Sequence, residues 1–179
     1  MNCIQNGSGF LRYLGFASGR GATCWGWLAV GVVTALFVGL SMRLPSVRQN
    51  LFRLSGLNLL GLAVAVVAGI LEEVMFRKWI MDRMLTQGFG SLAQIAASGV
   101  AFGLLHGVWG LVGRSVRAAI GATMATGLLG AALAVVYLAS GRNLALCIAA
   151  HFLINALAEP GLVLAATRGE ITLASNSWK

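Results

Sequence analysis

Long apolar runs alternate with short polar segments along most of the chain. A helix that spans a membrane needs about 20 mainly apolar residues. The pattern predicts helices over residues 24–42, 54–85, 92–112, 117–139 and 143–158. A turn is predicted at residues 87–90, and Pro160 is expected to end the fifth helix because proline removes a helix hydrogen bond. The predicted fold is therefore all-α, a polytopic membrane bundle of about five transmembrane helices.

Three parts are predicted along the chain. Residues 1–53 form an N-terminal segment that contains the first helix and then a polar loop with Pro45. Residues 54–166 form a four-helix core, and residues 167–179 form a polar C-terminal tail. Gly99, Gly103 and Gly107 recur every four residues in the third helix, so they line one face where a neighbouring helix can approach closely.

Composition supports the membrane class. Hydrophobic residues make up 58% of the chain and charged residues 10%, whereas an average soluble domain has about 25% charged residues. This composition excludes a soluble enzyme. The formal charge is +8, but the Lys and Arg residues lie in the segments between apolar runs, where they meet lipid headgroups. No basic face with interleaved aromatic residues is present, so the expected partner is the lipid bilayer and not nucleic acid.

Four ionisable residues interrupt the apolar runs. Glu72 and Glu73 lie within or at the edge of the second predicted span, and His106 and His151 lie inside the third and fifth. A charged group at the bilayer centre costs about 2.5–3.5 kcal/mol on insertion scales, so such residues persist with a partner or a function. Their position therefore indicates a polar site within the bundle.

Spacing along the helices suggests how these residues are arranged. Glu73 and Arg77 are four residues apart, so they share a helix face and can pair. Glu72 lies 17 residues before Phe89, at the centre of the predicted turn, and His106 lies 17 residues after it. In an antiparallel hairpin these two residues face each other at one depth. On the fifth helix, His151 lies seven residues from the position that is expected at the same depth as Glu72 and His106.

Each residue alone has a structural explanation. A single histidine in a membrane helix usually makes a hydrogen bond between helices. Glu73 and Arg77 could be a structural ion pair, and Glu72 an interfacial carboxylate. The combination favours a site, because two acids, two histidines and Asn155, four residues after His151, lie on three helices that can converge.

Three motifs carry a resemblance to a known family. Residues 72–77 fit E-E-x-x-x-R, residues 102–106 fit F-x-x-x-H, and residues 151–155 fit H-x-x-x-N. In order and spacing the chain resembles the CPBP family of intramembrane proteases, which includes type II CAAX prenyl endopeptidases and bacterial relatives linked to bacteriocin processing and immunity. The resemblance implies a multi-pass protein of the bacterial cell membrane. It also implies hydrolysis of a peptide bond in a membrane-associated peptide or protein, of which a CAAX-like prenylated protein is one candidate.

Peptide hydrolysis needs an activated water, an oxyanion stabiliser and a proton for the leaving amine. Glu72 is suited to take the proton from water, and His106 to hold that water. His151 and Asn155 can donate hydrogen bonds to the oxyanion. Glu73 and Arg77 are expected to support this catalytic set by fixing the helix and the orientation of Glu72.

The alternatives concern metal and function. Zinc could be held by Glu72, His106 and His151, but H-E-x-x-H is absent. Asn155 is a poor zinc ligand and a good oxyanion donor, which favours a mechanism that requires no cofactor. A non-catalytic immunity factor or scaffold remains a second function class. A transporter would call for an inverted repeat, which the sequence lacks.

Overall fold

The computed structural model describes residues 7–16, 24–53, 55–108, 110 and 115–171. Within these ranges the chain is helical and contains no strand. The helices are α1 (Gly7–Tyr13), α2 (Cys24–Ser41), α3 (Pro45–Asn50), α4 (Gly56–Glu73), the π-helix η1 (Val74–Met81), α5 (Asp82–Thr86), α6 (Ser91–His106), α8 (Val116–Ala139) and α9 (Leu144–Thr167).

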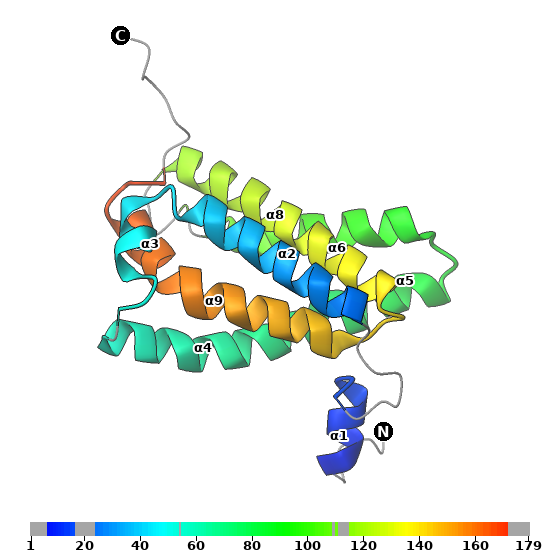
Figure 1. Ribbon diagram of the computed structural model, residues 1–179. Coiled ribbons are helices and arrows are strands. Elements are labelled where there is room, and N and C mark those ends of the chain that lie inside the picture. Colours follow the sequence, from blue (N-terminus) through cyan, green and yellow to red (C-terminus); the bar gives the residue numbers. More distant parts are fainter. Residues whose placement is uncertain (1–6, 17–23, 54, 109, 111–114, 172–179) are drawn as a thin grey trace.

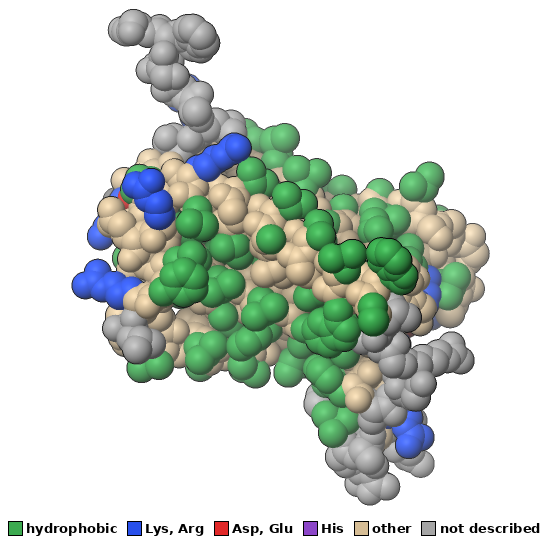
Figure 2. Space-filling view, in the orientation of Figure 1, with side chains coloured by type: hydrophobic (Ala, Val, Ile, Leu, Met, Phe, Trp, Pro, Cys, Tyr) green, Lys and Arg blue, Asp and Glu red, His purple; other side chains and the backbone are tan. Residues whose placement is uncertain are grey.

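Four of the described helical segments are long and apolar enough to cross a membrane. They are α2, the continuous helix Asn58–Thr86, α8 and α9. The shorter apolar helix α6 has 16 residues, about 24 Å at 1.5 Å per residue, which is less than the roughly 30 Å of bilayer hydrocarbon. The predicted helical membrane bundle is confirmed. Figure 2 shows hydrophobic side chains across the middle of one face and Lys and Arg side chains towards its ends.

Helix α9 holds the bundle together. It packs against α2, α3, α4 and α8, while α8 packs most extensively against α6. Figure 1 shows α2 lying between α8 and α9, with α4 on the other side of α9. The α6–α8 contact uses the glycine face that the sequence predicted, because a Cβ atom at Gly103 would lie 2.5 Å from the Thr123 carbonyl oxygen.

The prediction that α9 ends at Pro160 is wrong. The helix continues to Thr167 with Pro160 in its interior. Neighbouring helices can compensate a proline in a membrane helix, and here the packing is close. A Cβ at Gly61 of α4 would lie 2.8 Å from Pro160 Cγ, and one at Gly161 would lie 2.4 Å from Val47 Cα of α3. Gly61 therefore leaves the space that the Pro160 ring occupies, and Gly161 lets α9 approach the backbone of α3.

Two further boundaries differ from the prediction. The predicted polar loop at Pro45 contains the short helix α3, with Pro45 in its first turn, where a missing N–H costs no helix hydrogen bond. Helix α6 ends at His106, and Gly107 and Val108 form a turn. Half of the predicted extension over residues 107–112, namely residues 109, 111 and 112, lies outside the described residues.

A polar contact joins the end of α9 to the start of α3. The Glu170 carboxylate accepts hydrogen bonds from the Ser46 backbone N–H at 3.0 Å and from its hydroxyl at 2.7 Å. Arg168 also donates to the Ser46 hydroxyl oxygen at 3.0 Å. The Ser46 hydrogen bonds hold the pKa of Glu170 below its ordinary value. This contact fixes α3 beside the C-terminal half of α9.

Candidate active site

The polar residues gather at the middle of the spans. Glu72 is the midpoint of the helix Asn58–Thr86, and Asn155 lies next to the midpoint of α9. The π-helix η1 begins directly after Glu73. Single π-turns inside long helices are frequent at functional sites. The helix therefore changes its winding at the point where it presents its two glutamates to the bundle.

Glu73 is the centre of a buried ion pair. Its Oε1 accepts from Arg77 Nη1 at 3.0 Å, and both side chains are fully buried. Arg77 also donates to the Gly130 carbonyl of α8 at 2.9 Å, and its guanidinium carbon lies 5.2 Å from the centre of the Phe102 ring. Because desolvated charges are costly unless they are paired and hydrogen-bonded, these contacts fix η1 against α6 and α8.

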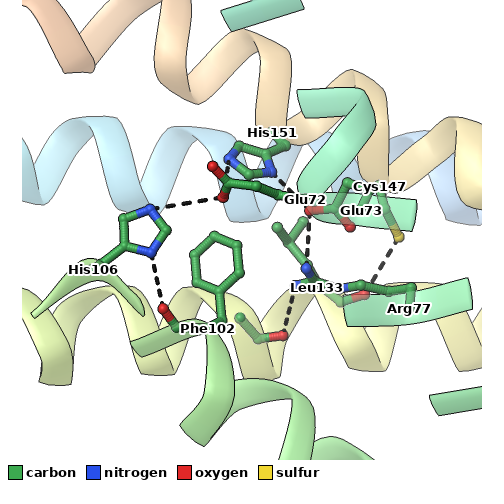
Figure 3. A network of polar contacts seen from close by, with 9 residues as sticks. Glu72, Glu73, Arg77, Phe102, His106, Leu133, Cys147 and His151 are labelled. Carbon is green, nitrogen blue, oxygen red and sulfur yellow. Dashed lines mark hydrogen bonds and ion pairs between the residues drawn. The ribbon is translucent and has the colours of Figure 1, made fainter. Parts of the chain in front are cut away.

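The same Glu73 oxygen holds His151. His151 Nδ1 lies 2.7 Å from Glu73 Oε1 in a buried contact. Since the Glu73 carboxylate accepts, Nδ1 carries the proton and donates, and in the neutral ring Nε2 is an acceptor. Glu73 therefore orients the imidazole and leaves its Nε2 facing Glu72 (Figure 3).

His106 is oriented by its own helix. Its Nδ1 donates to the Phe102 carbonyl oxygen at 2.9 Å. The imidazole also stacks on the Phe102 ring, with centroids 4.5 Å apart and planes 24° from parallel. The Phe102 and His151 rings meet edge-on, with their centroids 5.5 Å apart. The phenylalanine of the F-x-x-x-H motif thus supports both histidines, and the Nε2 atom of His106 is left facing Glu72.

Glu72 lies between the two histidines. Its Oε2 is 3.7 Å from His106 Nε2 and 3.7 Å from His151 Nε2, and Figure 3 shows both rings turned toward it. This distance is too long for a direct hydrogen bond. Oε2 is buried and accepts no hydrogen bond within the described part of the chain. A water 2.8 Å from Oε2 and from either Nε2 would bridge the gap, as waters do across contacts of this length.

The site opens into a cavity of about 490 Å³. Its walls are mainly apolar side chains of α2, α8 and α9, among them Leu36, Phe37 and Leu129. The polar lining contains the predicted site residues together with one acid that the sequence did not single out: Glu72, His106, His151, Asn155 and Glu159. The cavity offers an apolar space for a substrate beside a carboxylate, two imidazoles and an amide.

The structure therefore brings together the four residues predicted as catalytic, Glu72, His106, His151 and Asn155. Two features were not predicted. One is the Glu73–His151 hydrogen bond, and the other is the position of Glu159 in the cavity lining. The signal for Glu159 was its spacing, since it follows Asn155 by four residues and His151 by eight. The expected end of α9 at Pro160 obscured that signal.

The donors of the zinc alternative are Glu72, His106 and His151. Their types suit zinc, and each histidine Nδ1 is held by an acceptor, as in many zinc sites. However, no group of three or more His, Cys, Asp or Glu side chains in the described ranges is arranged to hold a metal ion. A metal-free reaction through a water is therefore a proposal, and chelation tests it.

The comparison with protein families agrees with this geometry. The family model described as type II CAAX prenyl endopeptidase Rce1-like matches residues 54–157, more than half of the chain. The chain belongs to this family. The matched region of this Rce1-like protein contains all three motifs and ends just before Glu159. No curated protein and no solved structure matches the chain significantly. As an Rce1-like family member with four candidate spans, the protein is an integral membrane protein, and its general class is that of the CAAX-type intramembrane endopeptidases.

Proposed function

We propose that this protein hydrolyses a peptide bond of a membrane-associated protein by a glutamate-activated water, without a metal. The observation that carries the proposal is the position of Glu72 Oε2, which lies 3.7 Å from both histidine Nε2 atoms and accepts no hydrogen bond from any described residue. A water between these groups would touch a carboxylate that accepts its proton and an imidazole that orients it. The apolar cavity beside it would exclude bulk water and hold an extended, mainly apolar peptide.

The proposed reaction runs in two steps. Glu72 takes one proton from the water as the oxygen attacks the carbonyl carbon of the scissile bond. The resulting oxyanion accepts a hydrogen bond from the Asn155 amide, which donates in every protonation state of the site. Glu72 then gives its proton to the amide nitrogen, the C–N bond breaks, and a carboxylic acid and an amine leave. Glu73 and Arg77 do not touch the substrate but hold His151 and the helix in place.

Activity is tested with purified protein in detergent and a panel of membrane-anchored peptides, some carrying a prenylated C-terminal CAAX-like sequence. Cleavage products are identified by mass spectrometry. We expect specific endoproteolytic products from at least one peptide. A complete lack of cleavage across prenylated and unprenylated peptides would overturn the proposed activity.

Asn155→Ala tests the oxyanion donor. Removing one preorganised donor typically costs about 10²–10³-fold in turnover. Because the negative charge exists only in the transition state, kcat should fall by about that factor while KM changes little. Steady-state kinetics measures both constants, and Asn58→Ala, which lies near the start of α4 outside the cavity, is the control. A nearly silent Asn155→Ala would remove the amide from the mechanism.

Chelation tests the absence of a metal step. After prolonged incubation with a chelator and removal of the chelated metal, we expect kcat to stay within about twofold of the untreated enzyme, because the proposed base is a carboxylate that acts on free water. Metal content is measured in the same samples by mass spectrometry. Loss of activity that zinc restores would instead assign Glu72, His106 and His151 as metal ligands.

A further inference from the structure

Glu159 is a cavity residue that the proposed mechanism does not use. It lies on α9, one helical turn beyond Asn155 and two beyond His151, and it lines the same cavity as both. It also lies outside residues 54–157, the part of the chain that the family model matches.

Close packing fixes the position of Glu159. The preceding residue, Ala158, is fully buried, and the following residue, Pro160, is also buried. Pro160 packs into the space left by Gly61 of α4, and Gly161 packs on the backbone of Val47. With its neighbours held on both sides, the backbone at Glu159 has a defined place, and its side chain lines the cavity.

Glu159 differs from the other acids of the chain. The structure describes all five Asp and Glu residues. Four of them face a cation, a histidine or a hydroxyl donor: Glu72, Glu73, Asp82 and Glu170. Among the described residues, Glu159 Oε2 is buried without a hydrogen-bond partner, as Glu72 Oε2 and Glu73 Oε2 are, but Glu159 has no ion pair. None of the ion pairs between described residues includes Glu159.

A carboxylate in a mainly apolar cavity is costly unless a donor reaches it. Around the cavity the two other carboxylates, Glu72 and Glu73, face one arginine, Arg77, and two histidines. Arg77 is already engaged by Glu73 and the Gly130 carbonyl. A basic group of whatever occupies the cavity would supply the partner that Glu159 lacks among the described residues, and in a peptide substrate its source is a lysine or arginine side chain.

We propose that Glu159 is an acidic subsite that binds a basic side chain of the substrate within about two residues of the scissile bond. This inference rests on the proposed protease function. Four helical residues separate the Glu159 and Asn155 positions, a rise of about 6 Å. An extended peptide advances about 3.3 Å per residue, so a peptide whose scissile carbonyl lies at Asn155 brings a side chain two residues away to Glu159.

The test is a matched series of single-span peptides in phosphatidylcholine liposomes. Each carries Lys, Met or Glu at one of the four positions around the cleaved bond, with the rest of the sequence unchanged. For the wild-type protein we expect kcat/KM to be about 10- to 100-fold higher with Lys than with Met at one position, the range of a charge-assisted hydrogen bond. In Glu159→Gln the Lys and Met peptides should become equal. In Glu159→Lys the preference should move to Glu.

Glu170→Gln is the matched control, because it makes the same chemical change at a residue that does not line the cavity. It should keep the wild-type preference. Thermal unfolding in detergent checks that each variant is folded, and a folded Glu159→Gln that still prefers Lys overturns the proposal. An equal fall in kcat for every peptide also overturns it, because that result makes Glu159 a proton donor in the reaction.

A binding measurement separates this proposal from the proposed function. Fluorescence anisotropy of the labelled Lys and Met peptides gives their affinities without cleavage. If the wild-type protein cleaves no peptide, the protease function fails. The subsite still stands if the Lys peptide binds more tightly and Glu159→Gln removes the difference, and it fails if the two peptides bind equally to the wild-type protein.

Discussion

Glu72→Gln is expected to lower kcat by about 10²–10⁴-fold, the usual contribution of a positioned general base. The amide keeps the shape of the side chain but cannot take a proton from water. The fold should survive, because Glu72 is partly exposed to the cavity and makes no contact shorter than 3.7 Å with the histidines. Turnover of the best peptide substrate measures the loss, and thermal unfolding in detergent measures the stability.

The control for Glu72→Gln is Glu170→Gln, which removes a carboxylate outside the cavity and should keep the wild-type kcat. If Glu72→Gln retained wild-type turnover while remaining pure and folded, Glu72 would not be the base. That result would favour the non-catalytic class of function, in which the motif residues serve only to hold the helices together.

Glu73→Gln should mainly destabilise the protein. Removing one partner of a buried ion pair costs about 3–5 kcal/mol, because the remaining charge stays buried without compensation. Here Arg77 would lose the negative charge that it pairs with, and His151 would face a neutral amide in place of its carboxylate acceptor. The expected result is a lower free energy of unfolding in detergent and a lower yield of folded protein.

The chain provides a matched control on the same helix. Lys78 and Asp82 have the same i,i+4 spacing as Glu73 and Arg77, but they are 3.6 Å apart and partly exposed. Lys78→Gln should cost less than about 1 kcal/mol, as exposed pairs do. The double variant Glu73→Gln, Arg77→Met removes both buried charges and should recover much of the lost stability. A Glu73→Gln variant as stable as wild type but inactive would instead place Glu73 in the chemistry.

Much of the bundle could be predicted from local sequence. Apolar runs of about 20 residues define spans whatever surrounds them, so α2, α8 and the helix that contains Glu72 begin and end close to their predicted limits. Pro160 misled the prediction because its cost depends on its neighbours. Gly61, 99 residues earlier in the chain, leaves the space that the proline ring fills.

The candidate site was partly determined by the same local rules. The spacing of Glu73 and Arg77 fixed their pairing within one helix. Equal distances from a tight turn placed Glu72 opposite His106, and the two lie 3.7 Å apart. For His151, counting residues through two loops gave a position seven residues away from the depth of Glu72. The structure removes that offset, because such counting assumes parallel helices of equal tilt.

Only the tertiary structure decided which groups each of these residues meets. Glu73 contacts His151, 78 residues away, and α2 forms a wall of the cavity. Glu159 lines the same cavity, and its Oε2 has no hydrogen-bond partner among the described residues. These relations depend on how each helix is rotated about its axis and how closely its neighbours approach. Rotation and approach are set by side-chain packing between segments that are distant in the sequence, and the pattern along one helix does not contain that information.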